Sequence, residues 1–220
     1  QKQATGFPKD MPLLGWSMTK TINMMTFYKK AQETNFDMNQ LVINAFPANR
    51  EPSWVAQWRQ DPQKSQIKVT DLMFMKSGLD IEDDYGPQGK VVQMLYGEPS
   101  MAGFAASQPM AHAPGTSWGY STGSSDIISQ IAQGMFPDDQ AYWQYWQKSV
   151  FEPIGVNSGT FATDTLGTWV GGSYVWANTG DWAKLGQLML NDGAWNSQQV
   201  IPTGWWKLAG TPAMPDGEGH

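Results

Sequence analysis

The chain has 220 residues, of which 15% are charged, and a formal net charge of −6. This length allows one large domain or two small ones, with a core that buries most of the apolar surface. The acidic balance and the lack of any lysine- or arginine-rich run argue against a nucleic-acid partner. No apolar run reaches the roughly 18 residues that a membrane-spanning helix needs.

The chain contains no cysteine and only two histidines, His112 and His220. A disulfide, a thiolate nucleophile and a cysteine-ligated metal are therefore excluded. Two histidines far apart in the sequence do not indicate a zinc site, and we expect no metal or organic cofactor. The first residues lack the charged-then-apolar order of a signal peptide, and cysteine content is not diagnostic, so bacterial periplasm and cytoplasm both stay open.

In the first half of the chain, apolar periodicity predicts a helix that begins near Ser17. Met18, Ile22, Met25 and Tyr28 recur at spacings of four, three and three, which places them on one helical face. Residues 46–66 contain three prolines and many polar groups, which predicts a surface segment with room for a short helix.

A short buried helix is predicted next, with Thr70 as its N-cap, Asp71 in its first turn and Gly78 as its stop. The segment 80–120 reads as mostly loop. Ile127, Ile128 and the apolar residues that follow a serine-rich cap predict a second core helix.

Residues 141–151, before a proline, predict a third core helix, and the glycine-punctuated stretch after it predicts irregular structure. A further helix is expected from Thr179 to Gly193, and Thr203 is expected to cap a final one through Trp206. Strand signals are few and short, so the residues alone indicate a mainly helical, loop-rich domain.

Ser17 and Lys20 are the residues whose pattern indicates chemistry. Three positions apart on a helix, they lie on one face within one turn of each other. A serine hydroxyl becomes nucleophilic when a neighbour takes its proton, and a lysine in apolar surroundings can do so because burial disfavours its charged form. The segment "LLGWSMTK" supplies such surroundings. Unpaired backbone N–H groups at the helix start could help to hold an oxyanion.

A Ser-x-x-Lys pattern is expected by chance about once in a chain of this size, given the usual frequencies of the two residues. This chain has a second example, Ser65 and Lys68 in "KSQIKVT". That pair lies in a polar stretch, where neither burial nor a helical face is expected. We therefore interpret it as solvated surface.

Four segments together resemble the serine β-lactamase and penicillin-recognising superfamily. "GWSMTKTI" is similar to its nucleophile segment, and "IKVTDLMFMKSGLDIEDDY" to its helix with a Ser-Gly-Leu turn. "HAPGTSWGYSTGSSDIISQIA" resembles its Pro-Gly-x-x-x-x-Tyr-Ser segment. "VGGSYVWANTGDWAKLGQLMLNDGAWNSQQVIPTGWW" resembles its class C-like branch, in particular the 6-aminohexanoate-oligomer hydrolase and esterase group.

The resemblance implies a role for individual residues. Ser17 matches the acylated nucleophile, Lys20 its proton-accepting partner, and Tyr120 the phenol that passes the proton to the leaving group. Tyr85 and Tyr174 match loops that border the pocket in this superfamily, so each is a candidate for substrate contact, with packing as the equal alternative.

The resemblance also has two departures. Thr122 stands where class C enzymes have an asparagine that binds a substrate carbonyl, and it is the third candidate for substrate contact. The expected third motif, Lys or His with Gly two places later, does not follow the Ile-Pro block; residues 76–78 spell it too early. Asp181 matches the acid of a Thr-x-x-Asp pattern, and we interpret it as a first-turn partner of the helix dipole.

The sequence thus predicts an α+β, β-lactamase/transpeptidase-like fold. Residues 1–220 would form a single domain, incomplete at both ends, that holds the helical part and the nucleophile helix but lacks much of the antiparallel sheet. The expected function is a serine hydrolase that acylates Ser17 with a small-molecule ester or linear amide. A β-lactamase or D-amino-acid peptidase, a non-catalytic acyl-binding sensor and an inert fragment are the alternatives.

Overall fold

The computed structural model describes residues 8–81 and 83–214, and helices make up most of its regular secondary structure. The α-helices are α1 (Met18–Thr34), α2 (Trp54–Gln60), α3 (Val69–Met73), α4 (Lys90–Gly97), α5 (Met101–Ser107), α6 (Thr122–Gly134), α7 (Asp139–Trp146), α8 (Thr179–Leu190) and α9 (Trp205–Ala209). Short turns of other helix types are η1 (Val42–Asn44), η2 (Lys64–Gln66), η3 (Gln147–Phe151) and η4 (Glu152–Ile154).

The strands are short: β1 (Leu13–Leu14), β2 (Thr160–Phe161), β3 (Val175–Ala177), β4 (Ala194–Trp195) and β5 (Gln198–Gln199). An antiparallel three-stranded sheet has the order β1-β3-β2, with Leu13 opposite Ala177 and Thr160 opposite Trp176. β4 and β5 form a separate antiparallel pair. Small antiparallel sheets beside a mostly helical chain confirm the predicted α+β class.

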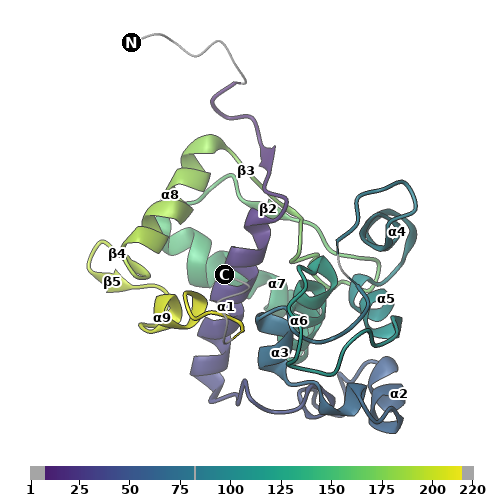
Figure 1. Ribbon diagram of the computed structural model, residues 1–220. Helices are drawn as coiled ribbons and strands as arrows, with labels where there is room; N and C mark the ends of the chain where they lie inside the picture. Colours follow the sequence, from purple (N-terminus) through teal and green to yellow (C-terminus); the bar gives the residue numbers. More distant parts are fainter. Residues whose placement is uncertain (1–7, 82, 215–220) are drawn as a thin grey trace.

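The core is centred on α6, in which every residue is buried. This helix packs against α1, α3, α4, α5 and α7, while α8 and α9 lie on the other side of α1 (Figure 1). A helix buried on all sides is held by its neighbours rather than by one apolar stripe. The polar residues at the start of α6 are thereby fixed beside α1, which is what creates the site described below.

The predicted start of the first helix is confirmed, because α1 begins directly after Ser17. Ile22, Met25 and Tyr28 are buried as expected, but Met18 is 55% exposed. The periodicity identified the buried face correctly. It could not show that the protein covers this face only from the second turn onward.

Two stretches are more ordered than the sequence suggested. The predicted loop 80–120 contains α4 and α5, and in α5 the Ser100 hydroxyl caps the helix by accepting the Gly103 N–H at 3.0 Å. Three of the four buried residues of α5 are alanines, which periodicity based on large side chains overlooks. In the predicted surface segment 46–66, α2 buries Trp54 and Trp58 in the core.

Two helix boundaries also differ from the prediction. α3 begins after Lys68, not at Thr70, because the Asp71 carboxylate accepts the Lys68 N–H at 2.9 Å. It ends at Met73, and Gly78, with a φ of 78°, lies in the turn beyond it. The last helix starts at Trp205 behind Gly204, so Thr203 is not its cap.

Within the described ranges, none of the helices combines the length and apolar character needed to cross a bilayer.

Candidate active site

The Ser17 hydroxyl accepts a hydrogen bond from Lys20 Nζ at 3.1 Å, as the spacing of the two residues predicted. Ser17 occupies the N-cap position of α1, yet its side chain makes no capping hydrogen bond. An N-cap serine ordinarily uses its oxygen to satisfy a backbone N–H of the first turn. In α1 the first-turn donors are satisfied by backbone carbonyls: the Met18, Thr19 and Lys20 N–H groups donate to residues 15, 16 and 17. The half-buried hydroxyl is therefore free for Lys20.

These backbone bonds correct one expectation, namely that the helix start would offer several unpaired N–H groups. The Ser17 N–H is different, because it donates to no acceptor within residues 8–81 and 83–214. It is thus the group of this turn that could hold a developing oxyanion.

The turn before Ser17 is held by β3 and α8. The Gly15 N–H donates to the Val175 carbonyl at 2.8 Å, and the Thr19 hydroxyl accepts the Val175 N–H at 3.2 Å. A Cβ at Gly15 would lie 2.4 Å from the Trp182 ring, so only glycine fits there. Trp16 has a φ of 46°, in the left-handed region that non-glycine residues rarely adopt. The segment is thereby locked so that Ser17 enters α1 in one orientation.

Lys20 is buried, with 6% of its surface exposed, and its Nζ has three hydrogen-bond acceptors. Besides Ser17 Oγ, these are Thr122 Oγ1 and the Gly172 carbonyl, both at 2.8 Å. Three acceptors match the three donors of an ammonium group. The structure therefore joins the start of α1, the start of α6 and the loop before β3 at one nitrogen atom.

Thr122, the third candidate for substrate contact, bonds two protein side chains in this structure. Its hydroxyl contacts Lys20 and Asp83, with 2.5 Å to Asp83 Oδ2, and its own N–H donates to Asp83 Oδ1 at 2.8 Å. Thr122 is itself 1% exposed. These contacts occupy the hydroxyl, so Thr122 belongs to the support of Lys20 in this structure.

Asp83 belongs to the candidate site, although no sequence pattern indicates it. It lies in an acidic stretch, "LDIEDDYG", that looks like ordinary solvated loop. The only signal in the sequence was its nearness to Tyr85, whose hydroxyl donates to Asp83 Oδ2 at 3.0 Å. Its pairing with Thr122 bridges 39 positions, which no local pattern reveals.

A second carboxylate, Asp126, lies completely buried one turn further along α6. Its Oδ1 accepts the Gly172 N–H at 2.9 Å, so the peptide that binds Lys20 is itself held from the other side. Burial raises the pKa of Asp126 to about 7, although the Gly172 hydrogen bond and the charge of Lys20 act in the opposite direction. The Asp164 and Asp83 charges add to the upward shift.

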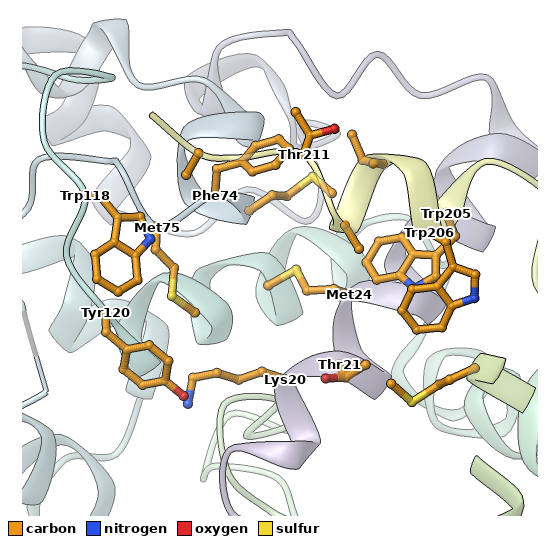
Figure 2. A pocket seen from close by; sticks show the side chains of 15 residues that line it. Lys20, Thr21, Met24, Phe74, Met75, Trp118, Tyr120, Trp205, Trp206 and Thr211 are labelled. Atoms are coloured by element: carbon orange, nitrogen blue, oxygen red, sulfur yellow. The ribbon is translucent and has the colours of Figure 1, made fainter. Parts of the chain in front are cut away.

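Tyr120 comes from the loop that precedes α6 and approaches Lys20 from the pocket side. Lys20 Nζ lies 5.0 Å from the centroid of the Tyr120 ring, within the range of a cation–π contact. Figure 2 shows the phenol pointing toward the end of the Lys20 side chain. Tyr120 is 37% exposed, so its ring is accessible from the cavity. The three residues expected to act together therefore meet at Lys20.

A cavity of about 290 Å³ opens beside Lys20 and Tyr120. It is lined mainly by apolar and aromatic side chains from α1, α3, α8, α9 and the loop that carries Trp118, and Figure 2 shows Met24, Phe74, Met75 and the two adjacent tryptophans of α9 around it. An apolar hollow next to a small number of polar groups is the usual form of a small-molecule site.

The two tyrosines that were expected to border this cavity are not among its lining residues. Tyr85 is 65% exposed, and its hydroxyl donates to Asp83. Partial desolvation, the Asp83 charge and this hydrogen bond raise the pKa of Tyr85. Tyr174 packs edge-on to Trp16, with 6.4 Å between ring centroids, and faces a separate hollow lined also by Tyr96 and Trp176. Trp16 also lines that hollow, so it borders the turn before Ser17.

Asp181 has a structural environment, as expected, although its partners go beyond the helix dipole. Its carboxylate accepts the Asn157 N–H at 3.0 Å and the Ser158 N–H at 2.8 Å, and it pairs with Lys184 at 2.7 Å. Burial alone would raise the pKa of Asp181, but the hydrogen bonds from Lys184, Ser158 and Asn157 together lower it to about 2. Asp181 thus joins α8 to the turn after η4.

The second Ser-x-x-Lys pair has none of these features. Ser65 lies in η2, and Lys68, which is exposed, makes no hydrogen bond with it in the described structure. This confirms the interpretation of Ser65 and Lys68 as surface.

Comparison with known proteins gives a family match over almost the whole chain. A family model described as Beta-lactamase matches residues 3–218. None of the curated proteins matches the sequence. The family match agrees with the four segments on which the resemblance was based.

Several solved structures have a similar fold. A "Putative 6-aminohexanoate-dimer hydrolase from Bacillus anthracis" is 16% identical with a TM-score of 0.73, and the match covers 93% of this chain and 54% of that one. A "putative beta-lactamase from Bacteroides dorei DSM 17855" is 16% identical with a TM-score of 0.71, covering 94% and 59%. "EstCE1, a hydrolase with promiscuous acyltransferase activity" is 12% identical with a TM-score of 0.64, covering 90% and 64%.

At these identities the likeness shows the fold alone, and that fold is β-lactamase-like, as predicted. The chain spans between 54% and 64% of the length of these three proteins.

Proposed function

This chain belongs to the β-lactamase family, and we propose that it is a serine hydrolase that cleaves an ester or a linear amide through an acyl-enzyme on Ser17. The observation that carries the proposal is the state of the Ser17 hydroxyl. This hydroxyl makes no helix-capping hydrogen bond and is bonded to Lys20 Nζ at 3.1 Å, and Lys20 in turn lines an apolar cavity. A serine with its base in hydrogen-bond reach is the arrangement that nucleophilic catalysis requires.

In the proposed reaction, Ser17 Oγ attacks the substrate carbonyl carbon while its proton passes to neutral Lys20. The Ser17 N–H is positioned to donate to the oxyanion that forms. When the bond to the leaving group breaks, the proton reaches that group through Tyr120, which lies at Lys20 on the cavity side. A water molecule then attacks the acyl carbon and gives a proton to Lys20, and Lys20 returns a proton to Ser17 Oγ as the acyl–oxygen bond breaks, which restores the hydroxyl and releases the acid.

The substrate class is inferred from the cavity and from Thr122. Apolar and aromatic walls favour an acyl or alkyl chain over a charged group. Thr122 stands where class C β-lactamases have an asparagine, and its hydroxyl is occupied by Lys20 and Asp83. Both points favour an ester or a linear amide over a β-lactam. Two proteins of similar fold, the "Putative 6-aminohexanoate-dimer hydrolase" and the "hydrolase with promiscuous acyltransferase activity", support the same choice within the class C-like branch.

Labelling with a fluorophosphonate probe and intact-protein mass spectrometry test the nucleophile. We expect a single adduct on the protein and on the matched control Ser65→Ala, and none on Ser17→Ala. Hydrolysis of p-nitrophenyl butyrate and of nitrocefin then separates the substrate classes. Turnover of the ester with little turnover of nitrocefin supports the proposal, whereas the reverse favours a β-lactamase.

Two other outcomes contradict an enzymatic role for this chain. A stable adduct on Ser17 from p-nitrophenyl butyrate, without release of acid, means that the chain acylates once and acts as an acyl-binding sensor. No adduct with any of the reagents means that Ser17 is not activated.

A further inference from the structure

The role of Asp83 depends on the proposed function, in which Lys20 takes the Ser17 proton, and it follows from the direction of each hydrogen bond. An ionised carboxylate only accepts hydrogen bonds. The Thr122 hydroxyl, 2.5 Å from Asp83 Oδ2, must therefore be the donor of that bond. The Thr122 N–H donates to the other oxygen, Oδ1, at 2.8 Å. The Asp83 carboxylate thus holds Thr122 by two hydrogen bonds, which fix the rotation of the Thr122 side chain.

A hydroxyl has a single proton, and in Thr122 that proton is committed to Asp83. Thr122 Oγ1 can consequently offer only a lone pair to Lys20 Nζ, 2.8 Å away. The Gly172 carbonyl, also at 2.8 Å, is an acceptor by its chemistry. Two of the N–H bonds of Lys20 are thereby directed away from Ser17, toward these two acceptors.

The remaining tetrahedral position of Lys20 Nζ is directed at Ser17 Oγ, 3.1 Å away. In the charged form this position is an N–H bond. In the neutral form it is the lone pair, and a lone pair aimed at the serine hydroxyl is what a general base needs. Of the two acceptors that enforce this orientation, only Thr122 could reverse its hydrogen bond, because a carbonyl cannot donate.

We propose that Asp83 is a positioning residue that aims the Lys20 lone pair at Ser17 by fixing the direction of the Thr122 hydroxyl. Without the carboxylate, the Thr122 proton can turn toward Lys20 Nζ and compete with Ser17 for the same lone pair. Asp83 acts entirely through Thr122 and Lys20, and its own carboxylate is not part of the proton transfer.

The test measures the rate of Ser17 labelling by the fluorophosphonate probe, together with kcat and KM for p-nitrophenyl butyrate. In Asp83→Asn the amide can donate to Thr122 Oγ1, which frees the Thr122 proton. We expect labelling and kcat to fall by about 10- to 100-fold, because the base is misdirected, with KM changed little. Asp83→Glu, which keeps a carboxylate, should recover part of the loss. Asp84→Asn, with the same change of charge in the same loop, should match the unaltered protein.

A double-mutant cycle distinguishes positioning through Thr122 from a general effect of charge or folding. Thr122→Val should slow labelling by a similar factor, and the double variant Asp83→Asn/Thr122→Val should be no slower than the slower single variant. If the double variant loses the product of the two single losses in labelling rate, or if Asp83→Asn is labelled at the normal rate, the role of Asp83 is overturned.

Equal melting temperatures of the variants ensure that folded proteins are compared. If Asp83→Asn does not fold, Asp83→Glu and Thr122→Val complete the cycle. If the unaltered protein is not labelled at Ser17, the proposed function itself fails and the role of Asp83 with it.

Discussion

The Asp126 carboxylate accepts the Gly172 N–H at 2.9 Å, and the carbonyl of the same glycine accepts a hydrogen bond from Lys20 at 2.8 Å. A fully buried acid on α6 therefore supports Lys20 through a single peptide unit. Because burial raises the pKa of Asp126 to about 7, this support carries a dependence on pH.

The first prediction concerns the stability of Asp126→Asn. The folded protein holds a proton on Asp126 between the unfolded pKa of 3.8 and the folded pKa of about 7, whereas the unfolded chain does not. The contribution of Asp126 to the free energy of unfolding is therefore greatest below pH 4, and this contribution disappears as the pH rises through 7. Asparagine does not titrate, so Asp126→Asn should gain stability relative to the unaltered protein between pH 4 and pH 8. Urea unfolding at several pH values measures the difference, and parallel curves would show that Asp126 is not perturbed.

A second prediction concerns Tyr120→Phe and the leaving group. Tyr120 is proposed to pass the proton to the departing group, and a group that leaves readily as an anion does not need that proton. Tyr120→Phe should therefore reduce the hydrolysis of an alkyl ester or alkyl amide by about 100-fold or more, and that of p-nitrophenyl butyrate much less. Steady-state kinetics on both substrates gives the comparison. Equal losses on the two would argue against this role.

The third prediction tests the close approach of the Gly171–Gly172 loop to α1 and α6. A Cβ at Gly171 would lie 2.2 Å from Ser129 Oγ and 2.5 Å from Asn23 Nδ2. Gly171→Ala should lower the free energy of unfolding by about 1–3 kcal/mol through overpacking. Gly186, inside α8, has no atom within 4 Å of such a Cβ, so Gly186→Ala should be neutral or stabilise by up to about 1 kcal/mol. Thermal unfolding of both variants checks the contrast.

A fourth prediction concerns acid stability and Asp181. Hydrogen bonds from Lys184, Ser158 and Asn157 outweigh burial and lower its pKa to about 2 in the folded protein, against 3.8 as the ordinary value. The resulting stabilisation is present above pH 4 and is lost as the pH falls toward 2. Asp181→Asn should therefore cost about 2 kcal/mol at pH 7, and this cost should shrink on acidification. Asp37→Asn, at an exposed position, is the matched control, and unfolding free energies at pH 7 and pH 3 show whether the two differ.

Much of the helical framework could be predicted from the sequence, because the pattern there is local. The start of α1, the core helix α6 and the run of α8 all follow from apolar spacing beside a capping residue. The helices α4 and α5 were missed, since glycines, prolines and small residues around them resemble a loop. The apolar faces of α4 and α5 are buried by packing against α6, which is a tertiary contact that the local sequence does not reveal.

The candidate site divides in the same way. Ser17 and Lys20 are three residues apart, so helix geometry alone brings them together. Tyr120 was identified by resemblance, and its approach to Lys20 agrees with that expectation. No local pattern indicates Asp83, Asp126 or the Gly172 carbonyl. The resemblance predicts a substrate contact for Thr122, and the structure adds its hydrogen bonds to Lys20 and Asp83. Each of these contacts joins segments distant in sequence.

By itself the sequence determined the class of fold, the family and the pairing of a serine with a lysine one helical turn away. These features depend on side-chain periodicity and on short segments, which are properties of neighbouring residues. Only the tertiary structure decided where the three donors of Lys20 point and what holds their acceptors. The direction of a hydrogen bond depends on which atoms surround it in space, and here those atoms come from three separate parts of the chain.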